Sequence, residues 1–144
     1  MINGGMIDMV DTTKLAIVVS EGTFDKAMMS MMLANTAASM GMEVHVFYTF
    51  FGLNLLKKGA SPKLAGMYRL FTGVFRKRMA KVGIEDFGGQ IKLAKELGVN
   101  LYACATTMGL MNIKKEDMVD GIKILGAAGF LDIAADSKVQ LFIG

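Results

Sequence analysis

The sequence predicts an α/β fold, a three-layer α/β/α sandwich around a mainly parallel five-stranded sheet. Several short runs are apolar throughout and rich in β-branched residues, the pattern of strands that are buried on both faces. These runs alternate with segments whose apolar residues recur at helical spacing. The chain has 17 glycines and one proline, as expected for regular elements joined by glycine turns. Strands and helices that alternate in this way build parallel sheets with helices on both faces.

The first three elements form a strand–helix–strand unit. Residues 14–20 (KLAIVVS) predict a central strand because they lack polar alternation. A helix follows, with Thr23 as its N-cap and Gly41 at its end, and residues 43–50 (EVHVFYTF) predict the second strand. Such units are right-handed almost without exception, so the helix is expected on one defined face of the sheet.

The rest of the chain continues the alternation. Residues 51–59 predict a short helix with a glycine stop, and residues 63–82 predict a longer amphipathic helix. The remaining predicted elements are helices at 86–97 and 128–136, and strands at 99–105, 122–127 and 138–143.

We expect one domain, residues 14–144, with a helical insert at about 60–85 and a flexible N-terminal arm, residues 1–13. A hydrophobic fraction of 53% is ample for a core at this length. The mean hydropathy of +0.43 is high, but the longest apolar run, residues 44–56, is shorter than the roughly 18 residues that a bilayer span needs. No signal-peptide pattern is visible at the start, so the sequence predicts a cytoplasmic protein.

Composition excludes several kinds of site. A single cysteine leaves no internal disulfide and no cysteine-rich zinc site. Neither nucleotide-binding glycine motif is present, and a net charge of +3 gives no argument for nucleic acid. Fourteen methionines would suit Cu(I), yet Met28 and Met31 fall on the apolar stripe of the first helix, where core packing is expected. We therefore expect no metal and no cofactor, and the apolar excess predicts a homo-oligomer.

Cys104 is the candidate for chemistry, and two interpretations of it are open. In one, it fills the core, as free cysteines often do. In the other, it ends the third strand directly before a helix capped by Thr106 or Thr107, where backbone N–H groups stabilise a thiolate. The single histidine, His45, lies within a predicted strand and no second thiol exists, so neither protease nor dithiol chemistry is expected. A lone reactive thiol is suited to carrying sulfur as a persulfide or S-sulfonate.

Six residues at the ends of the first three strands form the candidate substrate-binding set. Parallel sheets bind ligands beyond the carboxyl ends of their strands, and a helix start at this edge accepts a small anion. The set comprises Gly22 and Thr23 after the first strand, Phe51 and Gly52 after the second, and Thr106 and Thr107 after the third.

The amphipathic segment at residues 63–82 has three interpretations. Its apolar stripe comprises Leu64, Met67, Tyr68, Phe71, Val74, Phe75, Met79 and Val82, and its cations lie mostly off the stripe. We expect this helix to pack on the core or on a neighbouring subunit, with a solvated cationic back. Contact with acidic lipid, RNA or an acidic partner is one alternative. The other is a mobile flap over the Cys104 site, since Gly66 and Gly73 weaken the helix.

Three segments give the chain a family resemblance: KLAIVVSEGTFDKA, LANTAASMGMEVHVFYTFFGLNLLKK and ACATTMGLMNI, followed by a final LFIG. They resemble the DsrE/DsrF/DsrH-like superfamily, in particular its large-insert branch, which genomes often label as peroxiredoxin family protein. The likeness covers almost all of the chain after residue 13. The peroxiredoxin label has no support, because the Pro-x-x-x-Thr-x-x-Cys arrangement is absent before Cys104.

The resemblance implies an α/β/α sandwich in homo-oligomers and a role in cytoplasmic sulfur trafficking. It implies that Cys104 accepts sulfur as a persulfide or thiosulfonate and exchanges it with TusA-like and rhodanese-like carriers. Some members have a second cysteine nearby, and this chain has none, so handover to a partner is expected. The predicted function is a sulfur carrier or sulfurtransferase that holds sulfane sulfur or thiosulfate. The alternatives are an oligomeric assembly module with a structural cysteine, or a membrane-surface protein that uses the basic helix.

Overall fold

A parallel five-stranded sheet forms the centre of the molecule, as the sequence predicts. The computed structural model describes residues 12–144, so residues 1–11 of the predicted arm lie outside the described part. The strand order is β4-β3-β2-β1-β5, and every pair of neighbouring strands is parallel. The strands are β1 (Lys14–Val19), β2 (Glu43–Tyr48), β3 (Asn100–Cys104), β4 (Lys123–Leu125) and β5 (Val139–Ile143).

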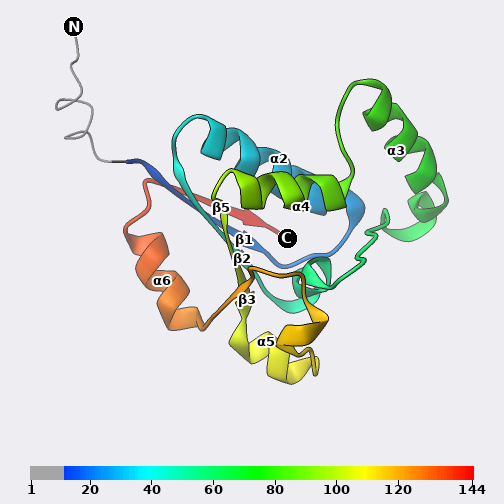
Figure 1. Cartoon of the computed structure of the whole chain (residues 1–144). Coiled ribbons are helices and arrows are strands. Elements are labelled where there is room, and N and C mark those ends of the chain that lie inside the picture. Colours follow the sequence, from blue (N-terminus) through cyan, green and yellow to red (C-terminus); the bar gives the residue numbers. More distant parts are fainter. Residues whose placement is uncertain (1–11) are drawn as a thin grey trace, which may run out of the picture.

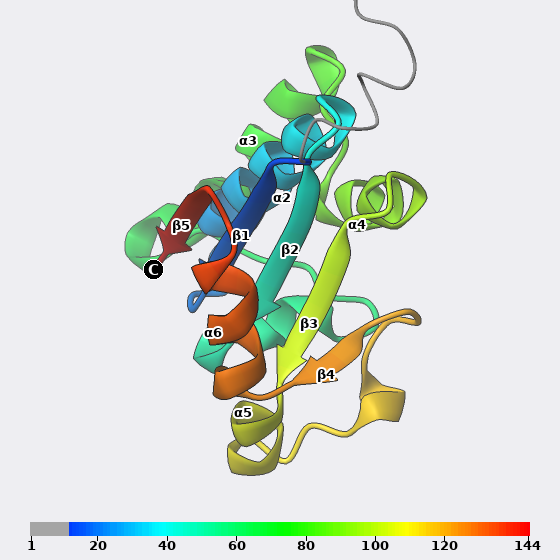
Figure 2. The same cartoon turned by 90° about the vertical axis from the view of Figure 1, so that its left-hand side faces the viewer.

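Helices cover both faces of the sheet, which confirms the predicted α/β/α layers. Figure 1 and Figure 2 show α2 (Phe24–Ser39) and α4 (Phe87–Glu96) on one face and α6 (Ala127–Ala135) on the other. The strand order explains this division. The chain moves outward from β1 to β4 and then returns past β1 to β5, and because crossovers are right-handed, the reversal places α6 on the opposite face. The shorter helices are η1 (Phe50–Leu56), η2 (Gly66–Phe71), α3 (Thr72–Lys81), α5 (Ala105–Leu110) and η3 (Lys115–Asp117).

Two cores of unequal size hold the layers together. The larger one lies between the sheet and the layer of α2, α4 and η1, and it contains most of the buried apolar residues. The smaller one lies beneath α6, where the rings of Phe47 and Phe130 stack with centroids 4.7 Å apart. Cys104 belongs to this smaller core. The α6 face is thinly covered, and Leu131 and Phe142 remain 64% and 73% exposed.

The predicted long helix at residues 63–82 is wrong in its extent. Residues 66–71 form the 3₁₀ helix η2, and the α-helix begins only at Thr72. Gly66 has a φ of +60°, a left-handed conformation that an α-helix cannot contain, so the regular helix starts after it. Of the predicted apolar stripe, Leu64 and Met79 are partly buried against the larger core and the other six residues are exposed.

The other helices and strands lie within about two residues of their predicted bounds, apart from residues 51–59, where the short helix is the 3₁₀ helix η1. The prediction of Thr23 as the N-cap of α2 is also confirmed, although its hydroxyl makes no capping hydrogen bond. Among the described residues, no helix has both the length and the hydropathy needed to cross a bilayer.

Two glycines allow the loops after β1 and β2 to approach closely at the carboxyl edge of the sheet. A Cβ atom on Gly52 would lie 2.3 Å from the carbonyl oxygen of Val19, and one on Gly22 would lie 2.8 Å from the carbonyl oxygen of Phe51. The Gly52 N–H also donates a hydrogen bond to the carbonyl of Ser20. These neighbours are backbone atoms, so a side chain at either glycine would force the loops apart.

We expect Gly52→Ala to lower the free energy of unfolding by about 1–3 kcal/mol, because the added methyl group overpacks against the end of β1. Gly73→Ala is the matched control. Gly73 lies in α3 with open space around it, so alanine there should raise stability by about 0.5–1 kcal/mol. Urea denaturation of both variants measures the difference. Equal stabilities of Gly52→Ala and the wild type would contradict the close approach.

Candidate functional site

Cys104 is the last residue of β3 and the N-cap residue of α5. Its backbone is extended, with φ −67° and ψ 118°, and the helix begins at Ala105. The predicted N-cap at Thr106 or Thr107 is therefore wrong, because the strand runs into the helix without an intervening turn. Both threonines lie in the first turn of α5, whose N–H groups have no acceptor within the helix. Those groups are available to the cysteine sulfur.

The environment of Cys104 favours its thiolate. Burial raises the pKa of the thiol, since it disfavours the charged form. Hydrogen bonds from the hydroxyl and the N–H of Thr107, from the hydroxyl of Thr49 and from the N–H of Thr106 act in the opposite direction. Their combined effect is larger, so the pKa of Cys104 lies below its ordinary value. A lowered pKa is the property that makes a cysteine nucleophilic at neutral pH.

A hydrogen-bond network fixes these donors. The hydroxyl oxygens of Thr49 and Thr107 lie 3.1 Å apart, and the N–H of Phe50 donates to the Thr107 hydroxyl oxygen over 3.1 Å. Each hydroxyl has a single proton, so when Thr49 donates to the Thr107 oxygen, the Thr107 proton points at the sulfur. Thr107 is 2% exposed, so its hydroxyl is shielded from water. The loop after β2 is thereby tied to the helix after β3.

Thr49 was not in the predicted substrate-binding set. The feature that would have identified Thr49 as a site residue is the parallel pairing of β2 with β3. Tyr48 is paired with Ala103, so the next residue of each strand, Thr49 and Cys104, reaches the carboxyl edge side by side. A threonine directly after the strand next to Cys104 is the feature that identifies this donor.

Two aromatic residues border this network at the surface. Phe50 and Phe51 are 56% and 63% exposed. Phe50 has a φ of +48°, a left-handed conformation that costs a non-glycine residue about 1–2 kcal/mol. The hydrogen bond from its N–H to Thr107 helps to hold this conformation. Cys104 itself is 6% exposed.

The structure brings together only part of the predicted set. Thr106 and Thr107 lie at the thiol, and Phe51 belongs to the neighbouring loop. Gly52 is buried and acts as a spacer against β1. Gly22 and Thr23 follow β1, and neither is among the groups that act on the Cys104 thiol.

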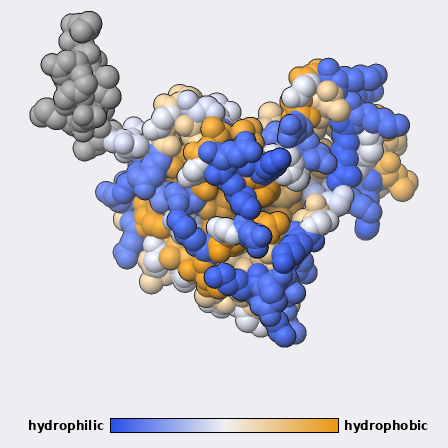
Figure 3. Space-filling view, in the orientation of Figure 1, coloured by the Kyte–Doolittle hydropathy of each residue, from blue (hydrophilic) through white to orange (hydrophobic). Residues whose placement is uncertain are grey.

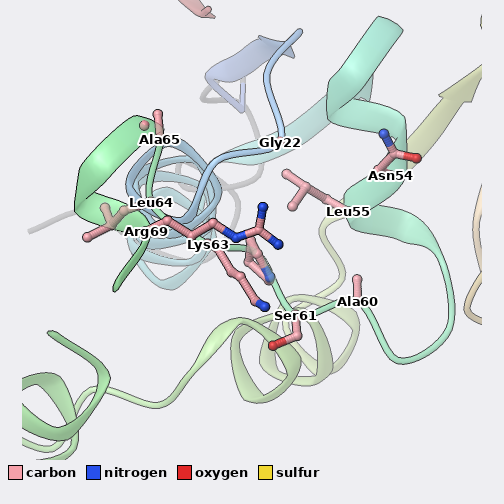
Figure 4. Close-up of a pocket in the computed structure, with 11 residues that line it drawn as sticks. Gly22, Asn54, Leu55, Ala60, Ser61, Lys63, Leu64, Ala65 and Arg69 are labelled. Atoms are coloured by element: carbon pink, nitrogen blue, oxygen red, sulfur yellow. The ribbon is translucent and has the colours of Figure 1, made fainter. Parts of the chain in front are cut away.

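Gly22 instead lines a separate cationic pocket of about 580 Å³. Its other walls come from η1, from residues 60–66 and from Arg69. Figure 4 shows the side chains of Lys63 and Arg69 extending into it on the side of Ser61 and Leu55. Among residues 12–144, no acidic residue lines the pocket, so the two cations give it a positive potential. Cys104 is not part of its wall.

His45 is a structural residue of β2, as the sequence indicates. It is 7% exposed, its Nδ1 lies 2.8 Å from the hydroxyl oxygen of Tyr102, and its Nε2 lies 3.0 Å from Oε1 of Glu43. Both ring nitrogens are therefore occupied away from the thiol. Within residues 12–144, no three histidine, cysteine, aspartate or glutamate side chains come together as a metal site.

Comparisons with known proteins point to one family. A model of the DsrE/DsrF/DrsH-like family matches residues 11–68 and 61–142. The chain is 31% identical over 159 aligned positions to the protein of Allochromatium vinosum named "Sulfur carrier protein DsrE2", with 93% of this chain and 100% of that protein covered. It is also 31% identical over 156 positions to the protein YrkE of Bacillus subtilis, with 92% and 98% covered.

Two solved structures share the fold. The ychN protein from E. coli aligns with a TM-score of 0.64 and 12% identity over 91% of this chain and 99% of that one. A protein of unknown function from Methanobacterium thermoautotrophicum aligns with a TM-score of 0.66 and 10% identity over 90% and 98%. At these identities the likeness concerns the fold alone.

We expect Thr107→Val to raise the pKa of Cys104, because it removes the hydroxyl that stabilises the thiolate. Alkylation by iodoacetamide, followed from pH 5 to 10, should then show a higher apparent pKa and a slower reaction at neutral pH. Thr107→Ser keeps the hydroxyl and should behave as the wild type. Thr106→Val is the matched control, because Thr106 acts only through its backbone N–H. Equal shifts in Thr106→Val and Thr107→Val would show that the hydroxyl is not responsible.

Proposed function

The chain belongs to the DsrE/DsrF/DrsH-like family, and we propose that it is a sulfur carrier that holds sulfur covalently on Cys104. The observation that carries the proposal is the environment of this single thiol, whose thiolate is favoured by donors from Thr49, Thr106 and Thr107. Those residues lie at the carboxyl edge of a parallel sheet, where α/β folds place their ligands. The name of the Allochromatium relative as a sulfur carrier protein supports the same role.

Loading requires one displacement at sulfur. The Cys104 thiolate attacks the outer sulfur of a persulfide donor, R–S–SH. A new S–S bond forms on Cys104, the donor's S–S bond breaks, and the donor leaves as the thiolate R–S⁻. With tetrathionate, the thiolate attacks an inner sulfur and becomes Cys–S–S–SO₃⁻, and thiosulfate leaves. Both steps balance without an added oxidant. The donors that stabilise the thiolate would also hold the anionic persulfide.

The remaining candidate residues serve this reaction from a distance. Phe51, exposed at the rim, is suited to contact an incoming partner. Gly52 sets the position of the loop that carries Thr49. Gly22, which Thr23 follows in the chain, lines the pocket that contains Lys63 and Arg69, and the positive potential of this pocket attracts small sulfur anions to this edge of the sheet.

Release requires an acceptor outside the chain, because the chain has no second thiol to receive the sulfur. We place the exchange in the cytoplasm, with TusA-like and rhodanese-like carriers as the partners. A homo-oligomer is part of the proposal, and the thinly covered α6 face, with Leu131 and Phe142 exposed, is the surface suited to it. Light scattering at micromolar concentration tests this point, and a monomer would contradict it.

One observation favours a second candidate function. Cys104 is 6% exposed, as a structural cysteine in an assembly module would be. In that case alkylation of the native protein is slow at every pH, and Cys104→Ser changes stability without any loss of chemistry. The lowered pKa favours the carrier, since a purely structural cysteine has no need of thiolate donors.

Intact-mass measurement tests the carrier directly. After incubation with a persulfide donor or with tetrathionate, most of the wild-type protein should gain the mass of one sulfur atom or of one thiosulfonate group. Cys104→Ser should gain neither, and dithiothreitol should remove both additions. An unmodified wild type, or equal labelling of Cys104→Ser, would disprove the proposal. If Cys104→Ser is as stable as the wild type and is still not labelled, the missing label reflects the loss of the thiol and not the loss of the fold.

A further inference from the structure

Half of the chain's cations lie in one segment that contains no acidic residue. Residues 57–84 hold eight of the 16 lysines and arginines and none of the 13 aspartates and glutamates. On α3, Lys77, Arg78 and Lys81 are exposed, and none of them forms an ion pair within the described part of the chain. The segment is therefore a concentrated patch of uncompensated positive charge, while the rest of the chain is net acidic.

The same segment exposes large apolar side chains. They lie in the lobe formed by η2 and α3, residues 66–81, which Figure 1 shows projecting away from the sheet. Met67 and Leu70 are 78% and 87% exposed, and because a 3₁₀ helix repeats every three residues, they share one face. Figure 3 shows hydrophobic surface at the outer edge of this lobe, next to a hydrophilic surface. The exposed apolar residues of the lobe are Met67, Tyr68, Leu70, Phe71, Val74 and Phe75.

Charge and hydrophobicity together favour one kind of partner. A second copy that met this lobe across a two-fold axis would bring the same cations face to face. Nucleic acid would neutralise the cations but would leave the aliphatic side chains of Met67 and Leu70 without apolar contact. An anionic lipid surface satisfies both, since its headgroups pair with lysine and arginine and its acyl boundary accepts apolar side chains.

We propose that the η2–α3 lobe docks on an anionic membrane surface. Met67 and Leu70 enter the boundary between headgroups and acyl chains, and Lys77, Arg78 and Lys81 contact the headgroups. The contact is peripheral, and it is independent of sulfur chemistry at Cys104. It would hold the carrier beside the membrane with the sheet directed away from it.

Vesicle co-sedimentation tests the proposal. Wild-type protein should bind vesicles of phosphatidylcholine and phosphatidylglycerol, and should bind phosphatidylcholine alone far more weakly. Removing two charges with Lys77→Gln and Arg78→Gln should weaken binding about 25-fold, since each cation near an anionic surface contributes about fivefold. The matched control is Lys92→Gln with Lys95→Gln on α4, where two exposed cations lie outside the lobe and binding should be unchanged.

The apolar contribution has its own pair of variants. Met67→Ser with Leu70→Ser should weaken vesicle binding, whereas Met40→Ser, at a residue 73% exposed after α2, should not. All of these positions are exposed, so folding should be retained, and circular dichroism checks this. Cys104→Ser should bind vesicles as the wild type does, which separates this proposal from the carrier function.

Three results would overturn the inference. The first is a folded wild type that fails to sediment with anionic vesicles at low salt. The second is equal weakening by the α4 charge variant, which would show a response to net charge only. The third is a wild type that is an oligomer in light scattering while the Met67→Ser, Leu70→Ser double variant is a monomer. That result would show that the lobe contacts a second copy of the chain.

Discussion

The hydrogen bond between Thr49 and Thr107 is the contact on which the candidate site depends. It joins the loop after β2 to the helix after β3, over 3.1 Å, and the Phe50 N–H completes it. The hydroxyl whose proton is not used in this contact donates to the Cys104 thiol and counters the effect of its burial. The parallel register supplies the geometry, because it brings residues 49 and 104 to the same edge at the same level. Without this contact, the N–H groups of Thr106 and Thr107 would be left to oppose the effect of burial with less help from the hydroxyls.

The direction of the chain across the sheet explains the two unequal faces. The reversal between β4 and β5 leaves α6 as the main cover of one face, while α2, α4 and η1 cover the other. Cys104 lies in the thinner layer, beside Phe130 and Tyr102. A reactive group placed under a single helix needs little rearrangement to meet a partner, which suits the carrier role proposed for it. The exposed apolar residues of that face suit an interface between subunits.

The prediction of the fold depended on burial patterns that are strong in this chain. Residues 14–19 and 43–48 are mostly apolar, as expected for central strands covered on both faces, so their assignment needed no tertiary information. The prediction of one packed helix failed at residues 63–82, where most of the apolar stripe packs against no other part of the described chain. The apolar spacing of residues 63–82 suggested one packed helix, but Gly66 divides the segment and the lobe exposes its apolar side chains. Periodicity shows that residues share a face, and it does not show what covers that face.

The sequence by itself determined the fold class, the family resemblance, and the position of Cys104 at a strand end before a helix. These follow from local patterns, since each strand, helix and glycine stop is encoded within a few neighbouring residues. The tertiary structure decided which groups surround the thiol. It added Thr49, made Cys104 itself the cap of α5, and placed Gly22 in a separate cationic pocket. The physical reason is that strand register and sheet order bring together residues about 55 positions apart, and hydrogen bonds across that distance leave no periodic trace in the sequence.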